Sequence, residues 1–180
     1  AGMLLRADIL TKTLNSIPFT SRSKRKWKVI LTSASGKPYK QADARRFSKL
    51  EHIIIVCGHY EGVDQRFIDK YVDVEISIGD YVLTGGEIPA MVITDSIVRL
   101  IPGVLEKPEA TENESFTENL LEYPQYTRPE EIEGLKVPYV LLSGNHAEIK
   151  KWRNKESLKK TKKVRPDLRP ASGGRQSAAS

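Results

Sequence analysis

The sequence contains one cysteine, Cys57, so it cannot form a disulfide within the chain. Such scarce cysteine fits a reducing compartment and predicts a cytoplasmic protein. CxxC pairs are missing and the three histidines are scattered. The ligand spacing of a structural zinc site is therefore not present.

Long apolar runs are missing too. The longest aliphatic stretch extends only from Ile53 to Cys57, whereas a membrane helix needs about 20 residues. The residues from Ala1 to Asp8 lack the charged and then apolar pattern of a secretory signal. We therefore expect no membrane segment. Neither GxGxxG nor a P-loop motif occurs, which removes support for a standard nucleotide site.

What the sequence does have is enough apolar material for a packed core. Hydrophobic residues make up 39% and charged residues 29% of the 180 residues, a balance that excludes wholesale disorder. The length suits one domain, or one domain with a small appendage.

Charge is distributed unevenly along the chain. Residues 150–169 hold ten Lys or Arg and two acids, a net charge of +8, while the whole chain has +6. A second basic group lies at 22–28, and residues 106–133 hold nine Glu. The basic blocks favour a polyanionic partner, with a solubilising helix and a surface loop as the alternative. The acidic stretch indicates a long exposed connector, a kind of segment that often acts as a lid.

Apolar patterning predicts alternating strands and helices. Strands are expected at 28–31, 52–57, 72–78 and 139–142, and helices at 41–50, 64–71, 89–101 and from about His146 onward. A turn is expected at 32–36, and Asn145 with Glu148 forms an N-cap signature. This alternation predicts an α/β fold with a mostly parallel sheet.

Three glycine-bearing loops fall at the ends of the expected strands, at 35–36, 57–62 and 77–86. Ligands of parallel sheets bind outside the carboxyl ends of the strands, and glycine lets the backbone approach a ligand closely. The side chains between the glycines of the last loop could wall an apolar slot for a flat heterocycle. Three ordinary turns, one of them a hairpin at Gly85-Gly86, are the alternative.

Charged side chains near these loops allow two interpretations as well. Glu61, Asp80 and Glu114 could act as a general base or offset a cation, or could simply be solvated. Arg99 near the end of an apolar helix could grip an anion with its planar fork, or complement the helix dipole.

Long motifs in a fixed order then indicate a family. They are Cys57-Gly-His-Tyr-Glu-Gly-Val-Asp64, Ile76-Ser-Ile-Gly-Asp-Tyr-Val-Leu-Thr-Gly-Gly-Glu-Ile-Pro-Ala-Met91, Arg99-Leu-Ile-Pro-Gly-Val104, Glu114-Ser-Phe116, Tyr126-Thr-Arg-Pro129, Leu141-Leu-Ser-Gly-Asn-His-Ala147 and Arg165-Pro-Asp-Leu168. To about Leu168 the chain closely resembles the bacterial tRNA (guanine-N1)-methyltransferases that modify position 37, next to the anticodon.

The resemblance implies a SPOUT-type α/β fold with a mostly parallel sheet, a C-terminal trefoil knot and a small helical C-terminal domain. It implies a homodimer with shared active sites, tRNA as partner and S-adenosylmethionine as cofactor. By position, the residues expected to bind the cofactor are Leu31, Ser33, Gly58, Glu61, Ser77, Ile78, Gly79, Asp80, Tyr81, Val82, Leu83, Gly85 and Gly86.

The implied reaction removes the proton of guanine N1 and builds negative charge toward O6. The resemblance assigns the base to Glu114, where the family has Asp, and guanine support to Arg99. It also implies magnesium, although no ligand set can be identified in the sequence. The residues expected to contact tRNA are Arg99, His146, Lys150, Lys151, Arg153 and Arg165.

The implied domains are a methyltransferase domain at 1–105, an acidic linker or lid at 106–128, a tRNA-binding domain at 129–169 and a disordered tail at 170–180. The family's first strand, helix and glycine-rich loop have no counterpart before Ala1, so the first domain is expected to be incomplete. This departure and the Asp-to-Glu change leave two alternatives: a catalytically impaired tRNA-binding relic, or another SPOUT enzyme acting on ribosomal RNA.

Overall fold

The computed structural model describes residues 3–18, 26–105 and 114–168. The chain divides into two compact units, Ala1–Glu106 and Lys107–Ser180. The predicted tail at 170–180, most of the basic group at 22–28 and the first part of the acidic stretch lie outside the described residues.

The first unit is built on a parallel three-stranded sheet in the order β2-β1-β3. Its strands are β1 (Trp27–Pro38), β2 (His52–Cys57) and β3 (Val74–Ser77). Central β1 pairs with β2 from Trp27 opposite His52 to Thr32 opposite Cys57. The predicted α/β class with a parallel sheet is confirmed within these residues.

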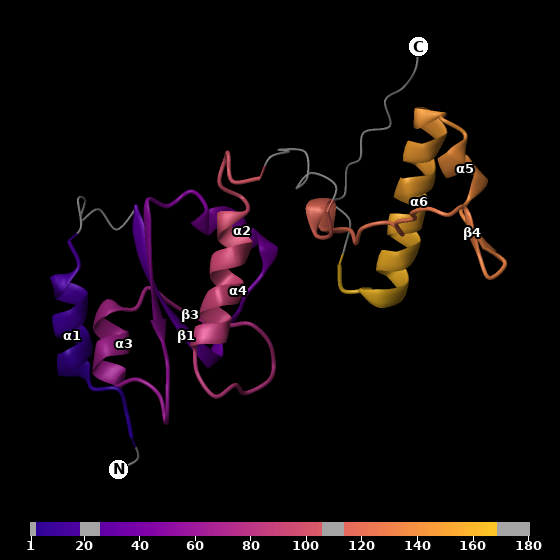
Figure 1. Cartoon of the computed structure of the whole chain (residues 1–180). Coiled ribbons are helices and arrows are strands. Elements are labelled where there is room, and N and C mark those ends of the chain that lie inside the picture. The colour runs from indigo at the N-terminus through magenta and orange to yellow at the C-terminus, as the bar shows by residue number, and fades with distance from the viewer. Residues whose placement is uncertain (1–2, 19–25, 106–113, 169–180) are drawn as a thin grey trace. The chain divides into compact units, whose positions relative to one another are not determined.

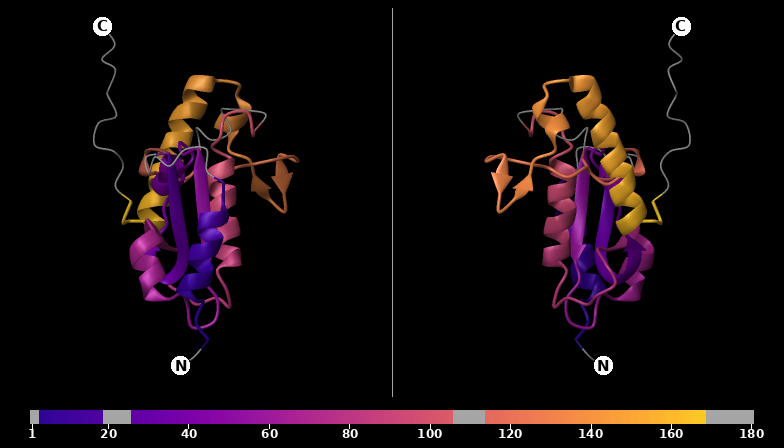
Figure 2. Two further views of the ribbon diagram at one scale, coloured as in Figure 1. Left: turned by 90° about the vertical axis from the view of Figure 1, so that its left-hand side faces the viewer. Right: turned by 90° about the vertical axis from the view of Figure 1, so that its right-hand side faces the viewer.

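Helices cover both faces of this sheet (Figures 1 and 2). They are α1 (Ala7–Ser16) and α3 (Gln65–Tyr71) on one side, and α2 (Gln41–Phe47) and α4 (Glu87–Val98) on the other. Alternation along β1 explains the two layers, because successive side chains of a strand point to opposite faces. Val29 and Leu31 pack with Leu14 and Phe67, whereas Ile30 packs with Ile93.

The turn expected at 32–36 is instead an excursion within β1. Thr32 and Lys37 both pair with Ile76 of β3, so the four residues between them bulge out of the ladder. A Cβ on Gly36 would lie 2.5 Å from the backbone nitrogen of Ile76. Only glycine fits where the bulged chain returns to β3.

The second unit consists of α6 (His146–Val164) with shorter elements beside it. A hairpin joins β4 (Glu131–Ile132) to β5 (Leu135–Lys136), and a single 3-10 turn, η2, spans Thr117–Asn119. The predicted N-cap of α6 is confirmed, since the Asn145 side chain accepts hydrogen bonds from the amides of Ala147 and Glu148.

The strand predicted at 139–142 is wrong. Residues Tyr139–Leu142 form the short helix α5, which begins after Pro138 and contacts α6. An apolar run of four residues has no periodicity of its own, so the pattern could not distinguish the two structures. Within the described ranges, no helix is both long and apolar enough to span a bilayer.

Candidate active site

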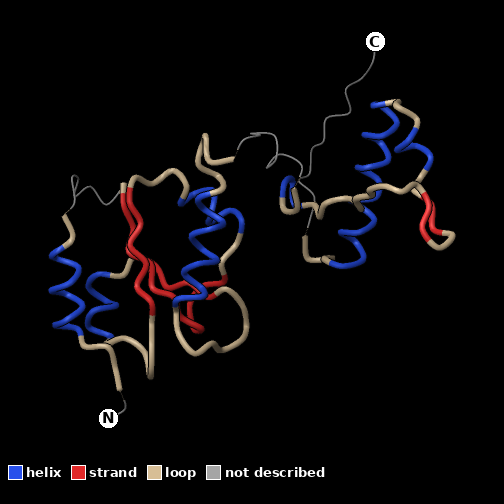
Figure 3. The backbone as a smooth tube through the Cα atoms, in the orientation of Figure 1, coloured by secondary structure: helices blue, strands red, loops and turns tan. Residues whose placement is uncertain are grey.

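A cavity of about 430 Å³ lies at the carboxyl ends of the three parallel strands. Its walls come from the β1 excursion, the loop after β2, and the segment from Ser77 to Gly86 between β3 and α4. Figure 3 shows this last segment as a broad loop that swings away from the sheet before α4 begins. The size falls within the range of small-molecule sites, and the position is the usual ligand position in parallel sheets.

Two glycines bring the loops together. The Gly86 amide donates a 2.8 Å hydrogen bond to the Gly58 carbonyl. A Cβ on Gly86 would collide with the Thr32 hydroxyl and lie 2.7 Å from the Gly58 nitrogen. The backbone of Gly86 has φ −84° and ψ −3°, which any residue can adopt. Close approach, rather than conformational freedom, therefore requires glycine here.

The segment after β3 is held by its own hydrogen bonds. The Ser77 hydroxyl donates to the Gly79 carbonyl at 2.9 Å, and the Tyr81 hydroxyl donates to the Ile78 carbonyl at 3.3 Å. Val82 is 86% exposed at the mouth of the cavity. The wall thus combines fixed main-chain groups with apolar side chains, as in the slot that the glycine pattern suggested.

The structure gathers the sequence-predicted cofactor residues around this one cavity, with the exception of Asp80. Their role in binding stays a prediction. Other lining residues were not anticipated, among them Thr32, His59, Tyr60, Gln65, Ile68, Thr84 and Pro89. Loop neighbours such as Thr84 could have been inferred from adjacency. Gln65 and Ile68 lie on α3, and no local motif indicates that this helix borders the cavity.

Cys57 lies beneath the loop junction, beside Gly86. Partial burial, followed by the negative charge of Glu87, raises the pKa of its thiol. A raised pKa keeps the sulfur protonated at neutral pH, and a protonated thiol is a poor nucleophile. The environment of Cys57 therefore disfavours covalent cysteine chemistry at this site.

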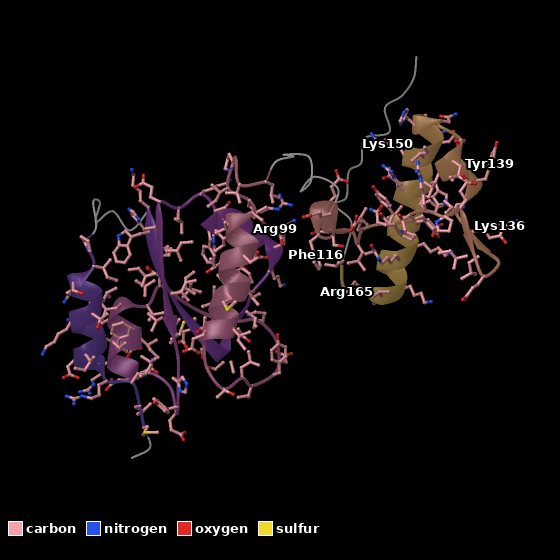
Figure 4. All side chains as sticks on the ribbon, in the orientation of Figure 1. Arg99, Phe116, Lys136, Tyr139, Lys150 and Arg165 are labelled. Carbon is pink, nitrogen blue, oxygen red and sulfur yellow. The ribbon has the colours of Figure 1, made fainter. Side chains whose placement is uncertain are left out.

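Arg99 does not line the cavity of its own chain. It is the C-cap of α4, whereas Gly86 at the cavity is the N-cap of the same helix. Twelve helical residues separate the two ends, a rise of about 18 Å. Figure 4 shows Arg99 at the end of α4 that is remote from its first residue.

The remaining predicted residues belong to the second unit. Glu114 precedes the 3-10 turn, and His146 is the first residue of α6. Lys151 pairs with Glu148 at 2.8 Å, and Arg153 lies over the Tyr123 ring at 4.8 Å. Lys150 is exposed on α6, and Arg165 is the C-cap of that helix. Across the described residues, no group of three or more His, Cys, Asp or Glu could hold a metal ion.

Comparison with known proteins adds independent information. The family described as tRNA (Guanine-1)-methyltransferase TrmD matches residues 1–171. The chain is 54% identical over 168 residues to a protein of Clostridioides difficile strain 630 named tRNA (guanine-N(1)-)-methyltransferase. It is 56% identical over 167 residues to one of the same name from Caldicellulosiruptor saccharolyticus. Each match covers 93% of this chain, but only 72% and 66% of the two relatives. The chain thus spans about two thirds of the length of such relatives.

Proposed function

Because the chain belongs to the tRNA (guanine-1)-methyltransferase family, we propose that it transfers a methyl group to N1 of guanine 37 in tRNA, next to the anticodon. The observation that carries the proposal is the cavity at the carboxyl ends of the strands, walled by the motif segments that follow β2 and β3. A tRNA substrate fits a protein of the cytoplasm.

The cavity suits S-adenosylmethionine, which when bound supplies an electrophilic methyl group on a sulfonium. Support comes from the close packing of the main chain around Gly58 and in the segment Ser77–Gly86, where a Cβ on Gly79 would meet the Tyr81 ring and a Cβ on Gly86 would meet the Thr32 hydroxyl. Ile78, Val82 and Leu83 line the cavity, and in this proposal main-chain groups of the loop recognise the edge of the heterocycle while the apolar side chains cover its faces. The close passage of Gly86 against Gly58 also supports a trefoil knot of the SPOUT type in this part of the chain.

Proton transfer is assigned to Glu114. Neutral guanine carries a proton on N1, and a carboxylate is a suitable acceptor for it. Arg99 stabilises the negative charge that develops on O6, because a guanidinium offers several donors in one plane. In this assignment Glu114 takes the proton from guanine N1, while Arg99 orients the guanine ring.

A homodimer explains why Arg99 is remote from the cavity of its own chain. Helix α4 is apolar on two sides: Ile93 and Ile97 are buried in the core, while Ile88, Met91 and Val92 are 60%, 71% and 44% exposed. A helix that is apolar all round is normally covered on all sides. A second copy of this chain on the exposed face buries it and lets Arg99 serve the partner's site.

Helix α6 supplies the contacts to tRNA. Its cations, with His146 at the first turn, form a surface that phosphates neutralise. Dependence on magnesium stays a prediction from the family resemblance.

Methyl transfer from labelled S-adenosylmethionine to a tRNA transcript with guanine at positions 36 and 37 tests the proposal. We expect incorporation at guanine 37, and about a 100-fold or greater loss in Glu114→Gln, a change that removes the base but keeps the side-chain shape. A transcript with adenine at position 37 is the matched substrate control. Salt-sensitive tRNA binding without incorporation, and without stabilisation by S-adenosylmethionine, would instead identify a tRNA-binding relic.

A further inference from the structure

Residues 114–126 form a segment that we call the strap. The strap runs antiparallel to α6 and contacts that helix over most of the length of the helix. The Tyr126 ring lies 6.2 Å from that of Trp152, and Tyr123 lies under the Arg153 guanidinium at 4.8 Å. Further along, the Leu121 amide donates to the Thr161 hydroxyl at 2.8 Å. The Thr161 hydroxyl itself donates to the Ser157 carbonyl, and both side chains are buried.

The first part of the strap folds into an unusual turn that carries Glu114. Phe116, Glu118 and Asn119 have φ values of 71°, 53° and 59°. Positive φ is rare for residues other than glycine, and for a bulky residue such as Phe it is a genuine outlier. The turn is closed by a 2.7 Å hydrogen bond from the Phe116 amide to the Leu120 carbonyl, and by one from the Glu122 amide to the Ser115 hydroxyl. Strained backbone of this kind persists only where surrounding contacts impose it.

Arg165 supplies such a contact from the end of α6 (Figure 4). Its guanidinium carbon lies 5.9 Å from the centre of the Phe116 ring. Two hydrogen bonds, 2.8 and 2.6 Å long, join its Nε and Nη2 to the carboxylate of Asp167. The bonded carboxylate raises the pKa of the guanidinium, and its two hydrogen bonds hold the guanidinium beside the ring.

Resting on the proposed function of Glu114, we propose that Arg165 is a positioning residue: it acts through the Phe116 ring to hold the strained turn that presents Glu114. Asp167 already neutralises its charge, so Arg165 is a poor phosphate ligand, unlike the exposed cations earlier in α6. Helix α6, which we expect to bind tRNA, thereby also sets the conformation of the turn that carries Glu114.

The test compares Arg165→Lys and Phe116→Leu with the unaltered chain. Lysine keeps the positive charge but has no planar fork to make the two-point contact with Asp167 that holds the cation beside the ring. We expect each variant to lower the single-turnover methylation rate about 10- to 100-fold, the loss typical of a misplaced catalytic group. The Kd for tRNA should stay within about twofold, because neither substitution removes a group that binds phosphate. Lys136→Ala, which removes a charge on the β4–β5 hairpin that Glu131 already offsets, is the control and should leave the rate unchanged.

Measuring Arg165→Lys in a Glu114→Gln background separates a positioning role from a general loss of structure. In Glu114→Gln, Arg165→Lys should cause no further loss of rate, because residues that act through one group are not additive. Three results would each overturn the proposal. They are a full additional loss of rate in Glu114→Gln, an unchanged rate in Arg165→Lys alone, and a weaker tRNA affinity with a normal rate.

Amide hydrogen exchange keeps the proposal testable if the unaltered chain transfers no methyl group, a result that would refute the proposed function itself. We expect Arg165→Lys and Phe116→Leu to speed exchange at Phe116 and Leu121, with the amides in the middle of α6 unchanged. Unaltered exchange at both positions would refute the positioning role of Arg165 independently of any activity.

Discussion

The amide of Gly86 and the carbonyl of Gly58 are joined by a 2.8 Å hydrogen bond, although the two residues are 28 positions apart in sequence. This contact ties the start of α4 to the loop after β2. It thereby fixes the two main-chain walls of the cavity relative to each other.

Gly86→Ala tests this junction. The added methyl group would meet the Thr32 hydroxyl and backbone atoms of residues 57 and 58, and overpacking of this kind destabilises by about 1–3 kcal/mol. We expect a lower midpoint of thermal unfolding and no rise on addition of S-adenosylmethionine. A ligand at 100 times its Kd otherwise adds about 2.7 kcal/mol.

Gly58→Ala is the matched comparison for that experiment. Its Cβ would approach only the Thr32 carbonyl oxygen, at 3.2 Å, so the loss of stability should be smaller. Equal effects of the two substitutions would show that close approach at Gly86 is not what holds the loops together.

Part of this architecture could be predicted from the sequence because it depends on local patterns. The run from His52 to Cys57 predicts a buried parallel strand. The parallel strand β2 has those bounds, but it lies at the edge of the described sheet and none of its residues is buried. Asn145 begins α6 because its side chain satisfies amides only two and three residues away. Local chemistry of this kind is visible in a single sequence.

Other features depend on contacts between distant segments. β1 extends to Pro38 because Lys37 and Pro38 find partners in β3, and the short helix α5 lies in contact with α6. The guanine-supporting role of Arg99 was expected from the family resemblance. That resemblance carried no information on the length of α4 that separates Arg99 from the cavity.

Asp64 predicts a pH dependence of stability. Its carboxylate caps α3 by accepting from the Arg66 amide, and hydrogen bonds from the Arg66 side chain and amide hold its pKa at about 2, below the ordinary 3.8. A depressed pKa in the folded state means that the charged form stabilises the fold. This contribution is complete above about pH 4 and is lost as the pH falls toward about 2.

Asp64→Asn keeps an oxygen acceptor for the cap but has no charge to lose. We expect the urea midpoint of the unaltered chain to fall more steeply between about pH 4 and pH 2 than that of Asp64→Asn. Parallel midpoints for the two proteins over this range would contradict the assigned role of the carboxylate.

The exposed face of α4 predicts a dimer that a single charge disrupts. Met91 is 71% exposed in the isolated chain, and Met91→Lys would place an ammonium group in an apolar interface. We expect the dimer Kd, measured by sedimentation equilibrium, to rise about tenfold or more. Ile9→Lys, at a 51% exposed site on α1, is the control and should sediment as the unaltered protein. A monomer in both the unaltered chain and Met91→Lys would exclude the dimer.

Salt dependence distinguishes the cations of α6 from paired surface charges. Lys150 is exposed on α6, and we expect Lys150→Ala to weaken tRNA binding. The slope of log affinity against log salt should fall by about 0.7 to 0.9 for each phosphate that the variant no longer neutralises. Lys136, whose Nζ lies 3.4 Å from a Glu131 carboxylate oxygen, is the matched control, since Lys136→Ala removes a charge that an acid already offsets. Fluorescence anisotropy of labelled tRNA at several salt concentrations gives both slopes. Identical slopes for Lys150→Ala and the unaltered chain would place the phosphate-binding groups on a surface other than this part of α6.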